Sequence, residues 1–311
     1  MAHHSFVPTT YHRTLGPHEP ALVIAPGDSV TTQTVDARGC DRDEQQVTDP
    51  GNPMTGPFFV EGAQPGDTLV VVFEQIVPNR RRGITSPRIA ANVLEPGFRV
   101  RHADDIDECV WEIDAQSQTA RMVAPDSSLS SIALPVEPML GCFGVAPSGG
   151  QAISTATSST HGGNMDYRRF APGATVYFPV FEPGALFFLG DGHALQGDGE
   201  IVGTGIEISM DVSFHVEVVR DHPISWPRAE DAEYLMTVGN ARPLDQCVQH
   251  ATSEMVRWLE EDYRLEPLVA HSLLGQRVEY DVGNVFDPAY TMVCKIRRRL
   301  VEQLSTGAAA G

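Results

Sequence analysis

Residues 206–218 read IEISMDVSFHVEV, and this stretch sets the expected fold. Every even-numbered position is apolar, and every odd-numbered position is polar or charged. Successive side chains of a β-strand point to opposite faces, so this period of two predicts a half-buried antiparallel strand. His215 lies on the polar face, where we expect a solvated side chain rather than a metal ligand.

The sequence before this strand has a similar β character. Up to about residue 220, glycine or proline recurs roughly every 8 to 12 residues. Short runs rich in β-branched residues lie between these breaks, at 21–24, 58–60, 68–76 and 175–180. This rhythm is typical of a sandwich or a barrel. We therefore expect a β-sandwich and barrel body over residues 1–225 that carries the site motifs.

The pattern becomes helical after residue 230. Pro243 suits a first helical turn, and apolar residues then recur at helical spacing as far as Leu259. Residues 266–274 predict a second short helix, which Gly275 can end, and residues 277–282 predict a strand. We expect residues 226–311 to form a smaller α/β part that packs on the body.

Composition excludes several classes of function. The formal net charge is −19, from 22 basic and 41 acidic residues, which argues against binding to nucleic acid or to an anionic membrane surface. The longest apolar runs, such as 69–73 and 185–189, are far shorter than the roughly 20 residues that span a bilayer. Five scattered cysteines without a CxxC pair, and no secretory signal at the start, predict a cytoplasmic protein.

Potential metal ligands concentrate in two segments, 161–166 (HGGNMD) and 190–200 (GDGHALQGDGE). Asp191 and His193 are two residues apart, so in an extended chain both point to one side, and Asp198 and Glu200 repeat this spacing. Carboxylate and imidazole together suit zinc or another divalent first-row ion, and an all-oxygen subset would suit calcium. The alternative is a Gly-Asp turn in a β-hairpin.

The glycine content of the second segment is also unusual. Residues 184–205 contain seven glycines but no GxGxxG motif, and a strand rather than a helix follows them. This context argues against a phosphate-binding loop. Such density indicates tight turns or a backbone that approaches a ligand closely.

A third segment, residues 55–67 (TGPFFVEGAQPGD), carries Glu61 at the end of an apolar strand. A partly desolvated carboxylate at a strand edge could act as a general base. The alternative is a solvated turn residue.

These three segments resemble the acetamidase/formamidase family in the same order along the chain. Looser likeness includes residues 26–28 (PGD), 34–36 (TVD) and the 239–259 helix, so the resemblance covers nearly the whole chain. Two features depart from the family pattern. Gln64 stands where an acidic residue is common, and the arginine run 80–82 is unfamiliar and bears on the substrate.

The resemblance implies hydrolysis of a short aliphatic amide, formamide or acetamide, to ammonia and a carboxylate. It implies a mainly β fold, with a β-sandwich, a barrel-like middle part and a small C-terminal α/β appendage. It also implies a homo-oligomer and a divalent metal; from the ligand types given above we expect zinc, with calcium the alternative.

Amide hydrolysis needs an activated water, a stabilised oxyanion and a proton for the departing amine. We expect Asp191 and His193 to be metal ligands that converge with His161, and Asp166 to be a further ligand candidate. Glu61 or Glu200 would carry the proton.

Three alternatives remain open at this stage. The same residues could hold a structural ion in a non-catalytic protein that binds a small ligand. The protein could instead be an amidase for a larger or anionic amide, with residues 80–82 near its pocket mouth. A hydroxyl among Ser154, Ser158 and Ser159 could be a nucleophile, although a Ser/Thr-rich loop is the favoured explanation and no GxSxG motif is present.

Overall fold

Two large β-sheets dominate the computed structural model, which describes residues 1–101 and 106–307. The larger sheet has nine strands, in the order β1 (His3–Ser5), β4 (Ser29–Gln33), β17 (Met210–Val219), β6 (Thr68–Pro78), β15 (Thr175–Pro179), β18 (Arg228–Glu230), β19 (Tyr234–Ala241), β21 (Tyr290–Arg297) and β20 (Glu279–Asn284). The smaller has six, in the order β13 (Ser158–Ser159), β14 (Gly162–Asn164), β11 (Met139–Gly144), β16 (Phe187–His193), β5 (Thr55–Val60) and β3 (Leu22–Ile24).

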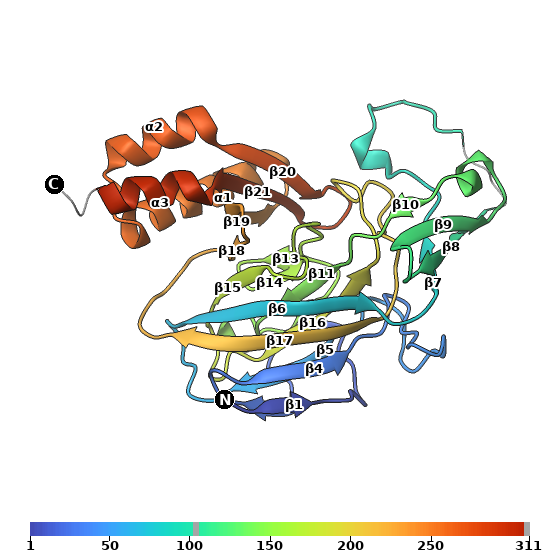
Figure 1. Cartoon of the computed structure of the whole chain (residues 1–311), viewed down its shortest axis with the longest axis horizontal. Helices are drawn as coiled ribbons and strands as arrows, with labels where there is room; N and C mark the ends of the chain where they lie inside the picture. The colour runs from blue at the N-terminus through green and yellow to red at the C-terminus, as the bar shows by residue number, and fades with distance from the viewer. Residues whose placement is uncertain (102–105, 308–311) are drawn as a thin grey trace.

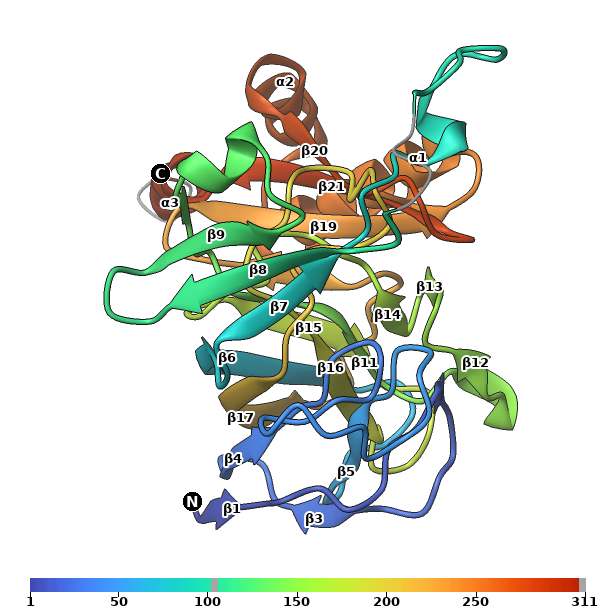
Figure 2. The same cartoon turned by 90° about the vertical axis from the view of Figure 1, so that its right-hand side faces the viewer.

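The two sheets pack face to face through aromatic side chains. Phe58 of β5 meets Phe214 of β17 with ring centroids 5.2 Å apart, and Phe73 of β6 meets Phe143 of β11 at 5.1 Å. All four rings are fully buried, and such edge-to-face pairs stabilise a core beyond their area alone. Figure 2 shows β6 and β17 on one side of this layer pair and β11 and β16 on the other. The expected mainly β fold is confirmed.

Smaller sheets flank the sandwich. A four-stranded antiparallel sheet contains β10 (Leu134–Pro135), β9 (Thr119–Ala124), β8 (Cys109–Asp114) and β7 (Arg82–Thr85), and lies at one end of the molecule (Figure 1). A two-stranded sheet joins β12 (Ile153–Ser154) to β2 (Thr14–Leu15). Short 3-10 turns occur at Ala91–Val93, Ser128–Ser131 and Ser148–Gly150.

The strand expected over 206–218 is antiparallel and half-buried, as predicted, but it begins later. β17 pairs with β4 and β6 from Met210 onward, and its apolar side faces the core. Residues 206–209 leave this ladder, and Glu207 instead bridges to Ile84 and to His193 of β16. Both faces are buried there, so the odd-numbered Glu207 lies inside the protein rather than in solvent.

Helices occur in the C-terminal part, as expected. α1 (Leu244–Arg257) continues into a π-helical turn, Trp258–Asp262, and buries Ala251 and Met255 against β19 and β21. α2 (Pro267–Arg277) runs through Gly275, so the prediction that this glycine ends the helix is wrong. Sequence reasoning did not predict β19, β21 or α3 (Arg298–Gly307).

The larger sheet continues across the boundary expected near residue 225. β15 of the body pairs with β18, and β19, β21 and β20 extend the sheet from there. The C-terminal part nevertheless has a buried cluster of its own, centred on Met255, Leu259 and Ile296. Its end beyond residue 307 lies outside the described residues. Among the described helices, none is both long and apolar enough to cross a membrane.

Candidate active site

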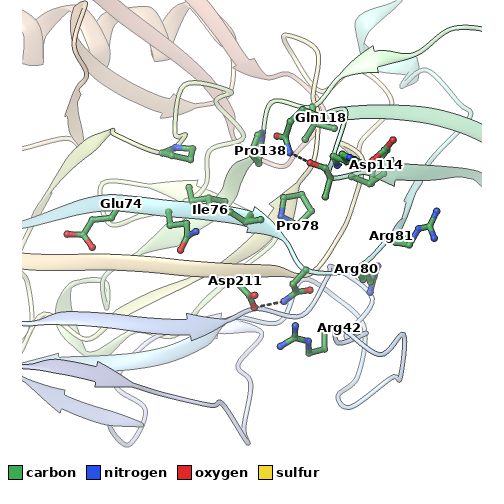
Figure 3. Close-up of a pocket in the computed structure, with 18 residues that line it drawn as sticks. Arg42, Glu74, Ile76, Pro78, Arg80, Arg81, Asp114, Gln118, Pro138 and Asp211 are labelled. Atoms are coloured by element: carbon green, nitrogen blue, oxygen red, sulfur yellow. Dashed lines mark hydrogen bonds between the residues drawn. The ribbon is translucent and has the colours of Figure 1, made fainter.

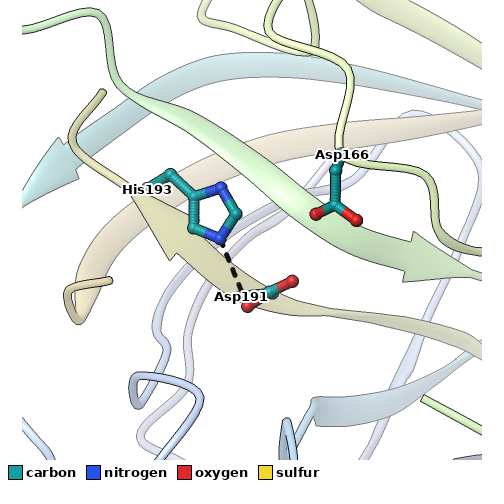
Figure 4. A group of neighbouring side chains, drawn as sticks. All are labelled: Asp166, Asp191 and His193. Carbon is teal, nitrogen blue, oxygen red and sulfur yellow. Dashed lines mark ion pairs between the residues drawn. The ribbon is translucent and has the colours of Figure 1, made fainter. Parts of the chain in front are cut away.

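Five carboxylates and one histidine meet beside the end of β16. They are Asp166, Asp191, His193, Glu200, Glu207 and Asp287, here called the acidic cluster. Every member is at most 8% exposed. Ligand atoms lie within 4.8 Å of one another in three overlapping groups: Asp166, Asp191 and His193; His193, Glu200 and Glu207; and Asp166, Glu200 and Asp287. Figure 4 shows the first group, with Asp166 opposite the strand that carries the other two.

The register of β11 brings these residues together. β11 pairs with β16, which places Met139 opposite His193, and with β14, which leads directly to Asp166. Gly141 of β11 lies between the two flanking segments. A Cβ atom there would lie 2.3 Å from Asp166 Oδ1 and 2.7 Å from Asp191 Oδ2. A glycine is therefore required for both carboxylates to occupy this space.

Close approach also explains part of the glycine-rich segment. A Cβ on Gly205 would lie 2.5 Å from the Nδ1 atom of His193, and a Cβ on Gly192 would lie 2.3 Å from the Met210 side chain. The backbone thus packs directly against the ring and against β17. These two glycines allow close packing of the backbone against the protein's own side chains, which is neither the tight turn nor the approach to a ligand that we expected from the sequence.

The backbone at three cluster residues is unusual. Asp166, Asp191 and Glu200 have φ values of 45°, 58° and 46°, in the left-handed region that residues other than glycine rarely adopt. Such conformations cost on the order of 1–3 kcal/mol each and concentrate at functional sites. Three strained carboxylates in one cluster therefore mark it as functional.

Three cluster residues each have one side-chain atom that forms a hydrogen bond and one buried atom that forms none. Asn284 donates to Asp166 Oδ2 at 3.1 Å, and the Gly205 N–H donates to Glu207 Oε1 at 3.0 Å. Asp166 Oδ1 and Glu207 Oε2 are buried without a hydrogen bond, and His193 Nε2, which also forms none, is in ion-pair contact with Glu207 Oε1 at 2.9 Å. Buried polar atoms are almost always paired, so these atoms indicate a missing electropositive ligand.

The electrostatics lead to the same conclusion. Burial raises the pKa of Asp166 and of Glu200 well above the usual range, and neighbouring carboxylates add to the shift at both. Burial raises the pKa of Glu207 to about 7 and that of Asp287 to about 6. Burial opposes protonation of His193, but Glu207 and Asp191 outweigh it and raise its pKa. A cation would relieve this repulsion.

His161 does not join the cluster. It is 1% exposed, and neither ring nitrogen has a hydrogen-bond partner. The neighbouring Gly162 pairs with Gly144, three residues along β11 from Gly141. At a strand rise of roughly 3.3 Å per residue this separation is about 10 Å. This register therefore does not bring His161 to Asp191 and His193, with which we expected it to converge.

Two further expectations need correction. Glu61 is exposed in the turn after β5, so the expected partial burial of its carboxylate is wrong. Asp198 and Glu200 do not share one side, because Gly199 between them has a φ of 83° and turns the chain. Asp198 is exposed and pairs with Arg168 at 2.9 Å, while Glu200 points into the cluster.

Sequence reasoning missed several residues of the site. In the sequence, Glu207 appeared only as a polar residue of the alternating 206–218 stretch. It enters the site because residues 206–209 do not pair with β4 and β6. Asn284 is the last residue of β20 and Asp287 lies three residues further on, and neither belongs to a motif. Gln196 lies in the 190–200 segment, which the sequence suggested as part of the site, but its role is visible only from its hydrogen bonds.

A large surface cavity lies elsewhere. Its volume is about 810 Å³, and Arg80 and Arg81 are among the residues that line it (Figure 3). Arg80 is buried and held by Asp36 at 2.5 Å, and Arg81 pairs with Glu112 at the surface. No member of the acidic cluster lines this cavity, so its arginines do not contact the candidate chemistry.

Fold and site together define a β-sandwich protein with a buried carboxylate–histidine centre suited to a divalent cation. The sequence profile of the Acetamidase/Formamidase family matches residues 11–150 and 149–240, and the chain belongs to this family.

Individual relatives agree. An acetamidase from Mycolicibacterium smegmatis is 30% identical over 226 residues, which cover 55% of this chain and 54% of that protein. The chain thus spans about half the length of the curated relatives it matches. A crystal structure of an acetamidase from Yersinia enterocolitica has a TM-score of 0.82 at 31% identity, covering 96% of this chain and 93% of that one. A protein described as a predicted acetamidase/formamidase, from Thermoanaerobacter tengcongensis, has a TM-score of 0.82 at 29% identity, covering 97% and 98%.

Proposed function

We propose that this protein is a metal-dependent hydrolase of short aliphatic amides, which converts formamide or acetamide and water to a carboxylate and ammonia. The observation that carries the proposal is a cluster of five buried carboxylates around His193 in which Asp166 Oδ1 and Glu207 Oε2 have no hydrogen bond. The names of the relatives support the reaction type.

The residues fit a divalent cation. Asp166, Asp191 and His193 offer the mixed nitrogen and oxygen donors of a zinc-type ion, whereas Asp166, Glu200 and Asp287 form an all-oxygen group that would also suit calcium. Such a cation would lower the pKa of a water molecule and polarise the amide carbonyl.

The remaining carboxyl groups supply proton transfer. Glu200 lies within the cluster, and burial raises the pKa of its carboxyl group well above the usual range. It can therefore donate a proton to the nitrogen that leaves as ammonia and recover one from the attacking water. Gln196 and Asn284 hold neighbouring groups in place by hydrogen bonds.

The surroundings of the cluster favour a small substrate. All six members are at most 8% exposed, which leaves little room for a bulky acyl group. The cavity lined by Arg80 and Arg81 does not include these residues, so the structure offers no direct support for the larger or anionic amide.

Ammonia release from a series of amides tests the proposal. We expect release from formamide and acetamide, its loss after treatment with a chelator, and its recovery when zinc is added back. Turnover that is unaffected by complete metal removal would contradict metal dependence. Binding of zinc without hydrolysis of any amide would favour the non-catalytic alternative.

We further propose that the protein is a cytoplasmic homo-oligomer. The five cysteines are free thiols, and several strands end the sheets with an unpaired edge that a second copy could cover. A monomer by light scattering at micromolar concentration would contradict the oligomer.

A further inference from the structure

The side chain of Gln196 forms hydrogen bonds with two members of the acidic cluster, Asp166 and His193. Gln196 is buried, with 5% of its surface exposed. The Nε2 atom donates to the backbone carbonyl of Asp166 at 2.6 Å and lies 3.5 Å from the carbonyl oxygen of Gly283. Carbonyl oxygens only accept hydrogen bonds, so this end of the amide must be the NH2 group. The opposite end is therefore the amide oxygen.

This orientation assigns a proton to the Nδ1 atom of His193. Gln196 Oε1 lies 2.8 Å from His193 Nδ1, and because an amide oxygen only accepts, Nδ1 must be the donor. The other nitrogen, Nε2, lies 2.9 Å from Glu207 Oε1 and 3.5 Å from Asp191 Oδ1. The hydrogen bond to Gln196 thus leaves Nε2 as the nitrogen that faces the carboxylates.

We propose that Gln196 is a positioning residue that holds the proton of His193 on Nδ1 and so directs Nε2 to bind the cation. The inference rests on the proposed function, because it concerns how the site prepares a neutral imidazole ligand. A donor bond from the distal nitrogen fixes the ring orientation of metal-binding histidines and strengthens their binding.

The same amide holds a second part of the site. Asp166 has a strained backbone with a φ of 45°, and its carbonyl accepts the Gln196 hydrogen bond. One side chain therefore joins the end of β16 to the second residue after β14, and these segments come together only in the folded protein. Replacing it by an apolar residue of similar length should loosen both at once.

Two variants separate these roles. Gln196→Met keeps the length but cannot accept from Nδ1, whereas Gln196→Glu keeps an acceptor and loses the donor to Asp166. Gln151→Met, at an exposed position, is the control for the substitution itself. Zinc affinity is measured by competition with a chromophoric chelator, and the His193 Nδ1 proton is observed by NMR on protein with 15N-labelled histidine.

We expect zinc to bind about 10- to 100-fold more weakly to Gln196→Met. Gln196→Glu should restore affinity to within a few-fold of the unmodified protein, and Gln151→Met should not change it. The Nδ1 proton resonance should be present in the unmodified protein and in Gln196→Glu, and lost in Gln196→Met.

Unchanged affinity in Gln196→Met, or equal losses in both Gln196 variants, would overturn the inference. The NMR resonance does not require metal. Failure of the unmodified protein to bind zinc would therefore refute the proposed function, while the resonance would still decide the role of Gln196.

Discussion

The two glutamates that the sequence offers as proton carriers lie in opposite environments. Glu61 is exposed in a turn, and its backbone N–H bonds to Ile24. Glu200 is 6% exposed and lies among carboxylates of the acidic cluster. Only a desolvated carboxyl group among like charges has its pKa raised into the range useful for proton donation. The environment, rather than the residue type, therefore selects Glu200.

Replacing each glutamate by glutamine tests this assignment. Gln keeps the shape and removes the titrating proton, so Glu200→Gln should lower kcat by about two to four orders of magnitude. Glu61→Gln should leave kcat unchanged and serves as the matched control. Steady-state kinetics and metal content decide the result. Loss of activity in Glu61→Gln alone would reverse the assignment, and loss of metal in Glu200→Gln would make Glu200 a ligand.

His161 has a pH signature of its own. Burial lowers its pKa from 6.5 to about 4, so the folded protein keeps the ring neutral while the unfolded chain takes up a proton. The stability that comes from a neutral His161 is therefore complete above about pH 6.5 and is lost as the pH falls towards 4. The full shift corresponds to roughly 3 kcal/mol.

Urea unfolding between pH 7 and 4.5 measures this effect. His161→Leu removes the titrating ring, so the free energy of unfolding should fall less with decreasing pH than in the unmodified protein. His271→Leu, at an exposed position, should keep the original pH dependence. Parallel curves for the unmodified protein and His161→Leu would show that the ring does not titrate between these limits.

At the scale of elements, hydrophobic periodicity predicted the strands and helices whose pattern is set by the local sequence. The period-two stretch gave a strand because its apolar positions all face one core, and the α1 pattern gave a helix for the same reason. β19 and β21 were missed because both are buried on nearly every face, which leaves no alternation to detect. Core strands of this kind are recognisable only once their neighbours are known.

The site depends on strand pairing that cannot be inferred from the sequence. Asp191 and His193 could be predicted because two-residue spacing alone puts them on one side of β16. Glu207 required β17 to begin four positions late, and Asp287 required β20 to lie beside the 197–205 segment. Backbone hydrogen bonds make that second contact, from Gly199 to Val282 and from Val285 to Gly199. Such long-range contacts follow from the register of whole sheets.

At the scale of the molecule, one sheet spans both parts of the chain, and the cluster depends on both. Asp166 and Asp191 come from the body, whereas Asp287 follows β20 in the C-terminal part. Asn284 of β20 donates to Asp166 Oδ2, and Asn164 donates to Asp287 Oδ2 at 2.5 Å. The site therefore joins the two parts at the same place where a cation would bind.

This arrangement predicts that bound metal stabilises the whole protein in a single unfolding transition. Zinc at 100 times its dissociation constant should add about 2.7 kcal/mol to the free energy of unfolding, and a chelator should remove that contribution. Met255→Ala, in the C-terminal core far along the chain from the body ligands, should cost about 2–5 kcal/mol and lower the same transition. Calorimetry with and without metal measures both effects. Two separate transitions, with only one responding to zinc, would show that the parts unfold independently and that the shared sheet does not couple them.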